Sequence, residues 1–308
     1  MSQNSISLPL KKRGGGLLAR QERRAGYLFI APALLGLLTF TALPILASLV
    51  LVFLKYDLLT PPEWVGLENI SRLSGDKRML TVYWNSIRLT LGATFLNNVL
   101  GLLLAVGVNR PMHWLLRYVL RTSIFFPVLT TTASLAVVWR YLLTLDRGVV
   151  NYLIGQIGIE PVPWLSSSTW ALFSAILYDV WKSCGYLMVI YLAGLQGISK
   201  TYYEAAEIDG AGRWQLFRYI TLPLISPTAF FAIVISLIGA FQIFDNVWVL
   251  TSGGPGDATR VIAMYIYEMA FKGFEMGYAA AVSLTLFAVL IILTLLQFFS
   301  ARRWVHYE

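Results

Sequence analysis

The sequence is poor in the residues from which disulfide scaffolds, metal centres and soluble surfaces are built. It has one cysteine, Cys184, and two histidines, His113 and His306, among 308 residues. One cysteine cannot form a disulfide within the chain, and these three side chains do not make a metal-binding pattern. Charged residues account for only 13% of the chain, too few to cover the surface of a water-soluble domain of this size. We therefore expect no metal site and no soluble fold.

Motifs for nucleotides and for catalysis are also missing. The phosphate-binding pattern G-x-x-x-x-G-K-[ST] does not occur, and the glycine-rich run at 253–256 has no lysine. No Ser/His/Asp, Cys/His or paired-carboxylate constellation stands out. The net charge is +8, but the basic residues gather at the ends of apolar runs, which membrane topology explains better than nucleic acid does. The sequence thus predicts no cofactor, no enzymatic activity and no nucleic-acid partner.

Apolar residues dominate the chain, at 57% with a mean hydropathy of +0.66. A helix needs about 20 apolar residues to cross a membrane core of about 30 Å. Six runs qualify, and they lie at 27–54, 84–108, 123–143, 171–195, 226–250 and 278–300. The first run is too long for a signal peptide. The sequence predicts an all-α membrane protein with six transmembrane helices, organised as a basic tail over 1–25 and a transmembrane domain over 26–308.

The distribution of charge predicts the orientation. The tail at 1–25 holds six basic residues against one acid, and the loop at 109–122 holds three arginines and no acid. Lysine and arginine are enriched in cytoplasmic loops. The loops at 144–170 and 251–277 have more acids than bases, which suits the outer side. Both termini are therefore expected in the cytoplasm, together with the loop at 196–225.

That loop is polar, unlike a minimal connector. The segment Tyr202–Asp209 is predicted to be a short helix, with Ser199 or Thr201 as its N-terminal cap. Gly210 is expected to end it, because glycine adopts the left-handed conformation at little cost. A second, amphipathic helix is expected over Trp214–Ile220.

The second half of the loop completes a shape suited to docking. Leu222-Pro223 is expected to break the amphipathic helix before the fifth span. Ala205 and Ala206 offer a surface of low relief, and Glu204 offers a carboxylate for an arginine of another protein. The loop is therefore interpreted as an L-shaped arm that docks into a groove of a partner.

The spacing of this loop resembles a known signature. Glu204-Ala205-Ala206, Gly210, Ile220 and Leu222-Pro223 resemble the signature loop of permease subunits of binding-protein-dependent ABC importers. Other segments resemble the carbohydrate branch, of the maltose and glycerol-phosphate type. They are VGLENI at 65–70, GVVNYLIGQIG at 148–158, LAGLQGISKTYYEAAEIDGAG at 192–212, TSGGPGDAT at 251–259 and GYAAA at 277–281.

The resemblance implies the type I ABC importer permease fold in a bacterial or archaeal cytoplasmic (inner) membrane. It implies a second homologous permease, two ATPase subunits that hydrolyse ATP, an extracytoplasmic substrate-binding protein, a carbohydrate substrate and surrounding membrane lipid. The loop would then be the coupling helix that meets an ATPase. Its coupling residues would be Glu204, Ala205, Ala206, Asp209, Gly210, Gly212, Leu222 and Pro223.

Polar groups within the spans are candidates for the substrate pathway, because they are costly in a membrane. Lys182 and Tyr186 are i, i+4 neighbours on the fourth span, and so are Phe241 and Asp245 on the fifth. Sugars suit a mixture of hydrogen-bonding groups and aromatic faces. The predicted pathway residues are Lys182, Tyr186, Phe241, Gln242, Asp245 and Asn246. Tyr186 also stands where maltose-type permeases place a sugar-contacting aromatic residue.

Simpler interpretations remain open for some of these groups. Asp179 and Lys182 are i, i+3 neighbours, and one interpretation is that they only neutralise each other's charge. Asn97 and Asn98 are expected to join helices by hydrogen bonds rather than to bind substrate.

Two alternative functions also stay open. An importer of glycerol-phosphate or another anionic polyol would use Lys182, although Asp245 opposes an anion. An ion-coupled secondary transporter would use the intramembrane charges and would need no ATPase.

Overall fold

A computed structural model describes residues 17–306. The first 16 residues, with the basic residues Lys11, Lys12 and Arg13 of the predicted tail, and residues 307–308 lie outside this description. The chain divides after Leu51 into two units. In the first unit, α1 (Leu17–Leu37), the π-helical turn η1 (Leu38–Ala42) and α2 (Leu43–Leu51) follow one another without a break. The first span predicted at 27–54 is therefore helical as far as Leu51, and the described part of the tail belongs to the same run.

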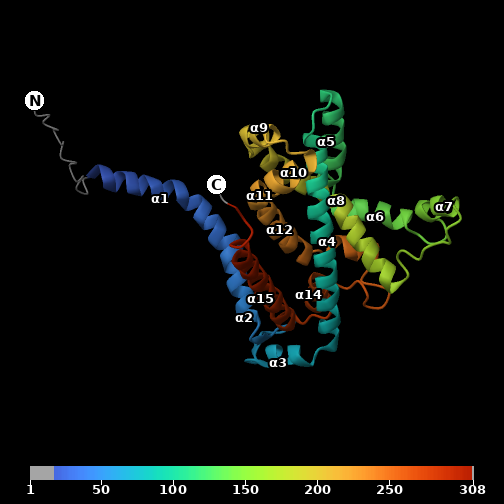
Figure 1. The fold of residues 1–308 in the computed structure, drawn as a ribbon. Coiled ribbons are helices and arrows are strands. Elements are labelled where there is room, and N and C mark those ends of the chain that lie inside the picture. The colour runs from blue at the N-terminus through green and yellow to red at the C-terminus, as the bar shows by residue number, and fades with distance from the viewer. Residues whose placement is uncertain (1–16, 307–308) are drawn as a thin grey trace, which may run out of the picture. The chain divides into compact units, whose positions relative to one another are not determined.

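The second unit begins at Val52 and is also mostly helical (Figure 1). Its strands β1 (Leu54–Lys55) and β2 (Glu63–Trp64) pair antiparallel, with Leu54 opposite Trp64. The helices that follow are α3 (Glu68–Gly75), α4 (Lys77–Asn109), α5 (Trp114–Leu129), α6 (Thr132–Leu142), α7 (Val149–Gly155), α8 (Ser168–Gly197), α9 (Lys200–Ile208), α10 (Arg213–Gln215), the π-helical η2 (Leu216–Thr221), α11 (Leu222–Leu224), α12 (Ser226–Phe241), α13 (Asp245–Leu250), α14 (Ile262–Tyr267), the π-helical η3 (Glu268–Lys272) and α15 (Met276–Ala301).

Within residues 17–306, four helical segments are long and apolar enough to cross a membrane alone: Arg20–Leu51, Lys77–Asn109, Ser168–Gly197 and Met276–Ala301. Two further candidates are bent pairs. α5 and α6 meet at 101°, and Arg213–Leu224 meets Ser226–Phe241 at 65°. Counting each bent pair as one span gives six, the number expected from the sequence.

The third span is not the continuous helix expected over 123–143. α5 begins earlier, at Trp114, and ends at Leu129, and α6 begins at Thr132. Pro127 lies in the last turn of α5, and the two residues between the helices, Thr130 and Thr131, are extended. Proline and β-branched residues both disfavour helix continuation. Apolar composition alone did not reveal this break.

The fifth span expected over 226–250 is also broken. α12 ends at Phe241, and α13 begins only at Asp245. Phe241 and Asp245 are therefore not i, i+4 neighbours on one helix, and that part of the sequence interpretation is wrong. The turn at 242–244 leaves Asp245 in the first turn of α13, where a carboxylate interacts favourably with the helix dipole.

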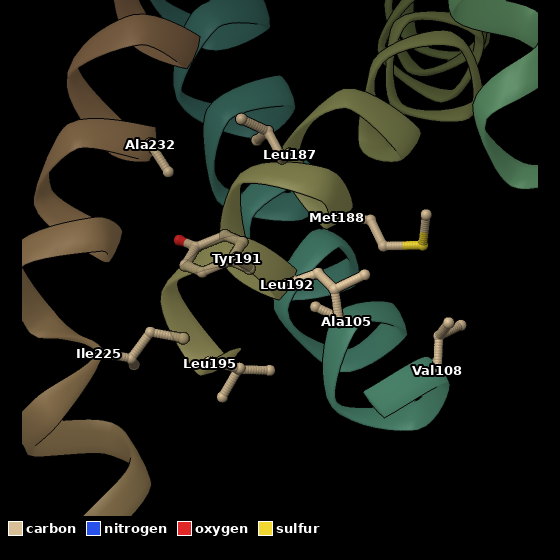
Figure 2. Packing of buried hydrophobic residues seen from close by; sticks show 9 residues of the cluster. All are labelled: Ala105, Val108, Leu187, Met188, Tyr191, Leu192, Leu195, Ile225 and Ala232. Atoms are coloured by element: carbon tan, nitrogen blue, oxygen red, sulfur yellow. The ribbon is translucent and has the colours of Figure 1, made fainter. Parts of the chain in front are cut away.

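The core of the second unit lies where α4, α8 and α12 pack together (Figure 2). Tyr191 and Leu195 of α8 are buried between Ala105 of α4 and Ile225 at the start of α12. Gly101 of α4 allows α4 and α8 to approach closely, since a Cβ there would lie 2.8 Å from the Cβ of Leu187. Small residues at such crossings let membrane helices pack backbone to backbone.

The two ends of α4 carry different structures (Figure 1). α3 lies beside the first residue of α4, and we call this the loop end. α9 and α10 lie near its last residue, and we call this the arm end. Segments far apart in sequence meet at the loop end, because the N–H of Met276 donates to the carbonyl of Tyr56 at 2.9 Å. The helix core thus separates two surfaces that can meet different partners.

Candidate functional site

The arm, defined as residues 199–225, forms its first helix as the sequence predicts. The Ser199 hydroxyl accepts a hydrogen bond from the N–H of Thr201 at 3.3 Å and caps α9. At the other end, Gly210 has a φ of +83°. The N–H of Ala211 donates back to the carbonyl of Ala206 at 2.9 Å, as in the glycine-ended helix caps of other proteins. The short helix and its glycine end are both confirmed.

The second half of the arm differs from the expectation. Leu222-Pro223 does not break the helix, because Pro223 lies in the first turn of α11, where a missing N–H removes no helix bond. The π-helical turn η2 precedes it, and the chain bends by 65° only before Ser226. The second half of the arm, Arg213–Leu224, and α12 are consequently one bent helical unit rather than two separate helices.

The surface of the arm is open to contact. Glu204, Ala205, Asp209, Gly210 and Gly212 are exposed, and Ala206, Leu222 and Pro223 are half-buried. Within residues 17–306, Glu204 makes no ion pair. The side chain of Ile208 is 87% exposed, the highest value among the large apolar side chains of the described residues. Sequence reasoning passed over Ile208, whose apolar side chain on a polar helix was the available signal.

A small cavity of about 230 Å³ lies within the arm. Ala206, Asp209 and Gly210 of the first half line it together with Tyr219 and Ile220 of the second half. The fold of the arm thus brings three of the predicted coupling residues to one recess.

A second cavity, of about 220 Å³, lies among α4, α8 and α12. Asn97, Asp179, Ser183, Tyr186 and Ser236 supply its polar lining. The Nδ2 of Asn97 donates to the carboxylate of Asp179 at 3.0 Å. The Oδ1 of Asn97 is buried and has no hydrogen-bond partner among the described residues. An orphaned acceptor of this kind is costly unless a ligand or water donates to it.

The other predicted pathway residues lie outside this cavity. Lys182 is half-buried one turn from Tyr186, and Phe241 is 3% exposed in the packed interior. Gln242 and Asp245 are exposed on either side of the helix break. Asn246 is buried, and its Oδ1 accepts from the N–H of Val247. Of the six predicted residues, only Tyr186 lines the cavity.

Two of the simpler interpretations are decided by contacts. Asp179 and Lys182 form no ion pair within 4.0 Å in the described part of the chain, and Asp179 accepts a hydrogen bond from Asn97. Asn98 joins three helices as expected, since it donates to Ser236 at 2.7 Å and accepts from the Tyr191 hydroxyl at 2.8 Å. Asn97 was expected to play the same part, but it also lines the cavity.

The loop end is held by a network of charged and hydroxyl groups that sequence reasoning missed. Asp76 caps α4 and also accepts from the hydroxyls of Tyr265 and Tyr278. Burial raises the pKa of Asp76, but these hydrogen bonds outweigh it and leave the pKa below its ordinary value. The partners lie 189 and 202 residues away in sequence, so no local pattern could reveal them.

Asp257 anchors the loop between α13 and α14 to the start of α4. Its carboxylate accepts from Arg78 at 2.8 Å and from Arg260 at 2.8 Å. The hydrogen bond from Arg78 lowers the pKa of Asp257, with a further contribution from the charge of Arg260. Arg260 also reaches Glu268 at 3.1 Å. This loop is therefore fixed to the helix bundle by ion pairs.

A cavity of about 600 Å³ opens beside this network at the loop end. Lys55 and Arg72 supply basic groups to its lining, and Asp57, Glu63, Glu68 and Glu275 supply acidic ones. Arg72 and Glu275 are paired at 2.9 Å. The mixture of exposed charges suits a polar contact with another macromolecule.

Known proteins are similar to this chain over nearly its whole length. Residues 97–306 match the family described as binding-protein-dependent transport system inner membrane component. The lactose transport system permease protein LacF of Rhizobium radiobacter is 36% identical, over 90% of this chain and 94% of LacF. The trehalose/maltose transport system permease protein MalF of Thermococcus litoralis is 33% identical, over 90% of this chain and 94% of MalF.

Solved structures share the fold. A bacterial ABC transporter involved in the import of the acidic polysaccharide alginate contains a chain with a TM-score of 0.82 and 25% identity, covering 94% of this chain and 99% of that one. The alginate ABC transporter in complex with an alginate pentasaccharide-bound periplasmic protein gives a TM-score of 0.83 at 24% identity.

Proposed function

Because this chain belongs to the family of binding-protein-dependent transport system inner membrane components, we propose that it forms half of the translocation pathway of an ATP-driven carbohydrate importer. Its fold is that of the type I ABC importer permeases, and it is a multi-pass protein of an inner membrane. The relatives at 33 to 36% identity are permeases for lactose and for trehalose and maltose. A sugar or oligosaccharide is accordingly the proposed substrate class.

The observation that carries this proposal is the arm. It presents an exposed carboxylate at Glu204, a low-relief patch at Ala205 and an uncovered apolar side chain at Ile208. A protein partner would bury that apolar surface and pair that charge. We assign this surface to a cytoplasmic ATPase subunit, with both chain termini on the same side of the membrane. ATP hydrolysis then belongs to that subunit, and this chain transmits the movement.

The bend between the arm and α12 supports a mechanical role. The arm continues into α12 through a single 65° bend, and α12 lines the cavity between α4 and α8 through Ile235, Ser236 and Gly239. A displacement of the arm therefore acts on a wall of the cavity. Closing and separating two such permease halves would alternate access to the pathway.

The lining of this cavity favours a neutral sugar over an anion. It contains hydroxyl, amide and aromatic groups and the carboxylate of Asp179, whereas none of its lining residues is a lysine or arginine. Sugar hydroxyls can donate to Asp179 and to the free Oδ1 of Asn97. A phosphate would be repelled by Asp179. An anionic polyol is thus the weaker candidate.

The remaining partners follow from the two ends of the molecule. We assign the loop end, with its 600 Å³ cavity of mixed charge, to the extracytoplasmic substrate-binding protein. A second, homologous permease would complete the pathway, because the cavity among α4, α8 and α12 holds only about 220 Å³.

Copurification tests the proposal. The tagged full-length chain is extracted from its native membrane in mild detergent, and its partners are identified by mass spectrometry. Recovery of an ATPase, a second permease and a sugar-binding protein is expected. The variant Ile208→Glu should lose the ATPase but keep the second permease, whereas Ile157→Glu, an exposed change away from the arm, should keep both. Recovery of the chain alone would favour an ion-coupled transporter.

A further inference from the structure

A fourth cavity, of about 630 Å³, lies at the arm end and takes no part in the proposed pathway. Leu103, Val106 and Arg110 at the end of α4 form one wall. Arg213, Trp214 and Phe217 of the arm form the opposite wall. Leu195, near the end of α8, closes its inner side. Because two membrane-spanning helices end here, the cavity lies at the boundary between membrane and water.

The polar rim of the cavity is basic. Arg110 and Arg213 both line it, and neither forms an ion pair within the described chain. Arg117 lies beside them, because its side chain donates to the carbonyl of Arg110 at 3.4 Å. The Nε of Arg117 is buried and has no hydrogen-bond partner among residues 17–306. Glu207 is the one acidic residue of the lining, so the positive charges outnumber the negative one.

The rest of the cavity is apolar. Leu103 is 56% exposed and Trp214 is 71% exposed, which leaves a large apolar surface next to the arginines. The rings of Trp214 and Phe217 lie 5.8 Å apart and form one face. Apolar walls beneath a basic rim match a molecule with an anionic head and a hydrocarbon tail. A basic pocket between membrane helices is the usual form of a site for an anionic lipid headgroup.

We propose that this cavity binds an anionic phospholipid. The phosphodiester group is held by Arg110 and Arg213, whose planar guanidinium groups suit phosphate oxygens. An acyl chain lies along Leu103, Val106 and Phe217. Arg110 belongs to the end of α4 and Arg213 to the start of α10, so the bound lipid bridges a fixed helix and the arm. The inference rests on the arm end lying at the membrane surface and not on transport.

The lining separates this site from the surface assigned to the ATPase. Glu204, Ala205 and Ile208 are not among the lining residues of the cavity. Ala206, Asp209 and Gly210 line a different recess. A lipid in the cavity and a protein on the surface assigned to the ATPase would therefore contact different residues and could bind at the same time.

Photolabelling tests the site. The full-length chain, purified with the subunits that accompany it, is placed in phosphatidylcholine vesicles that contain a trace of a diazirine-bearing phosphatidylglycerol. Labelled peptides are mapped by mass spectrometry. Labelling of the segments 103–110 and 213–217 is expected. The double variant Arg110→Gln/Arg213→Gln should need roughly 30-fold more probe for half-maximal labelling, since each arginine near a membrane surface strengthens anion binding about fivefold.

Two further variants test whether a loss of labelling comes from this cavity rather than from a general loss of positive charge or from misfolding. Arg302→Gln/Arg303→Gln removes the same charge from exposed positions at the end of α15 and should label like the wild type. Leu103→Trp fills the cavity without changing charge and should also abolish labelling while the chain stays inserted.

Three results would overturn the proposal. Equal labelling by a diazirine-bearing phosphatidylcholine would mean a nonspecific lipid contact. Unchanged labelling in the arginine double variant would remove the basic rim from the site. Crosslinks from these segments to a copurifying subunit in place of lipid would identify the cavity as a protein interface. Loss of transport with labelling intact would count against the proposed function alone.

Discussion

The hydroxyl groups of Tyr203 and Thr221 lie 3.1 Å apart and join the two halves of the arm. Thr221 donates to the carbonyl of Leu216 at 3.3 Å, which leaves its oxygen to accept from Tyr203. α9 is thereby fastened to η2, 18 residues further along the chain. A force on α9 is consequently transmitted to η2 and onward to α12.

Removing this hydrogen bond should loosen the transmission. Tyr203→Phe is expected to leave insertion and partner binding intact but to lower uptake several-fold relative to ATP hydrolysis, because one such bond contributes about 1 kcal/mol. The ratio of uptake to ATPase rate in reconstituted vesicles measures it. Tyr202→Phe is the matched control, since Tyr202 is exposed and the hydroxyl that contacts Thr221 in the described structure belongs to Tyr203. Equal ratios in both variants would contradict the role of the bond.

Gly210 should tolerate substitution only by residues that accept a positive φ. At its φ of +83°, a β-branched side chain is strained by roughly 1–3 kcal/mol. Gly210→Val is expected to distort the end of α9 and to uncouple ATP hydrolysis from uptake. Gly210→Asn should restore much of the coupling, because asparagine adopts this conformation more readily.

Gly212 provides the control for that series. Its φ is −75°, and a Cβ would lie 3.7 Å from the Oε1 of Gln215. Gly212→Ala should therefore behave like the wild type. Normal uptake by Gly210→Val in the same vesicles would show that the shape of this helix end does not matter.

The Asn97–Asp179 pair is expected to control passage of the sugar. Asp179→Leu removes the acceptor of the Asn97 amide and should reduce uptake about tenfold or more, since hydrogen bonds to charged groups contribute about 1.5–3 kcal/mol. Asp179→Asn keeps the shape and some hydrogen bonding, and should retain most of the uptake. Stimulation of ATPase activity by the binding protein should persist in both. Full uptake by Asp179→Leu would exclude the cavity from the pathway.

The anchor at Asp257 should weaken in acid. Because its pKa is lowered in the folded chain by Arg78, the ion pair stabilises the fold above the ordinary carboxyl pKa of about 3.9 and is lost as the pH falls through the lower folded value. Arg78→Gln should lower the midpoint of thermal unfolding at pH 7, by an amount corresponding to less than about 1 kcal/mol. The difference from the wild type should vanish on acidification.

Arg303→Gln is the comparison for that measurement, because Arg303 forms no ion pair in the described residues. Its difference from the wild type should stay constant with pH. A constant difference for Arg78→Gln as well would mean that Asp257 is not its partner in the folded protein.

Structural features that depend only on neighbouring residues could be predicted from the sequence. Ser199 and Gly210 bound α9 because a cap and a left-handed turn depend only on a few neighbouring residues. Breaks in apolar runs were not predictable in the same way. The runs at 123–143 and 226–250 are apolar enough on average to suggest single spans, yet the helices stop at Leu129 and Phe241, because a few residues at 130–131 and 242–244 leave the helical conformation.

The amino-acid sequence by itself determined the membrane class, the number of apolar runs and the family, since these depend on composition and on spacing along the chain. Tertiary structure alone decided which polar groups meet. Asp179 lies three residues from Lys182 but bonds to Asn97, 82 residues away, because α4 and α8 pack closely at Gly101. Spacing along the chain suggested Lys182 as the partner of Asp179, whereas the packing of α4 against α8 places Asn97 within hydrogen-bond distance of it.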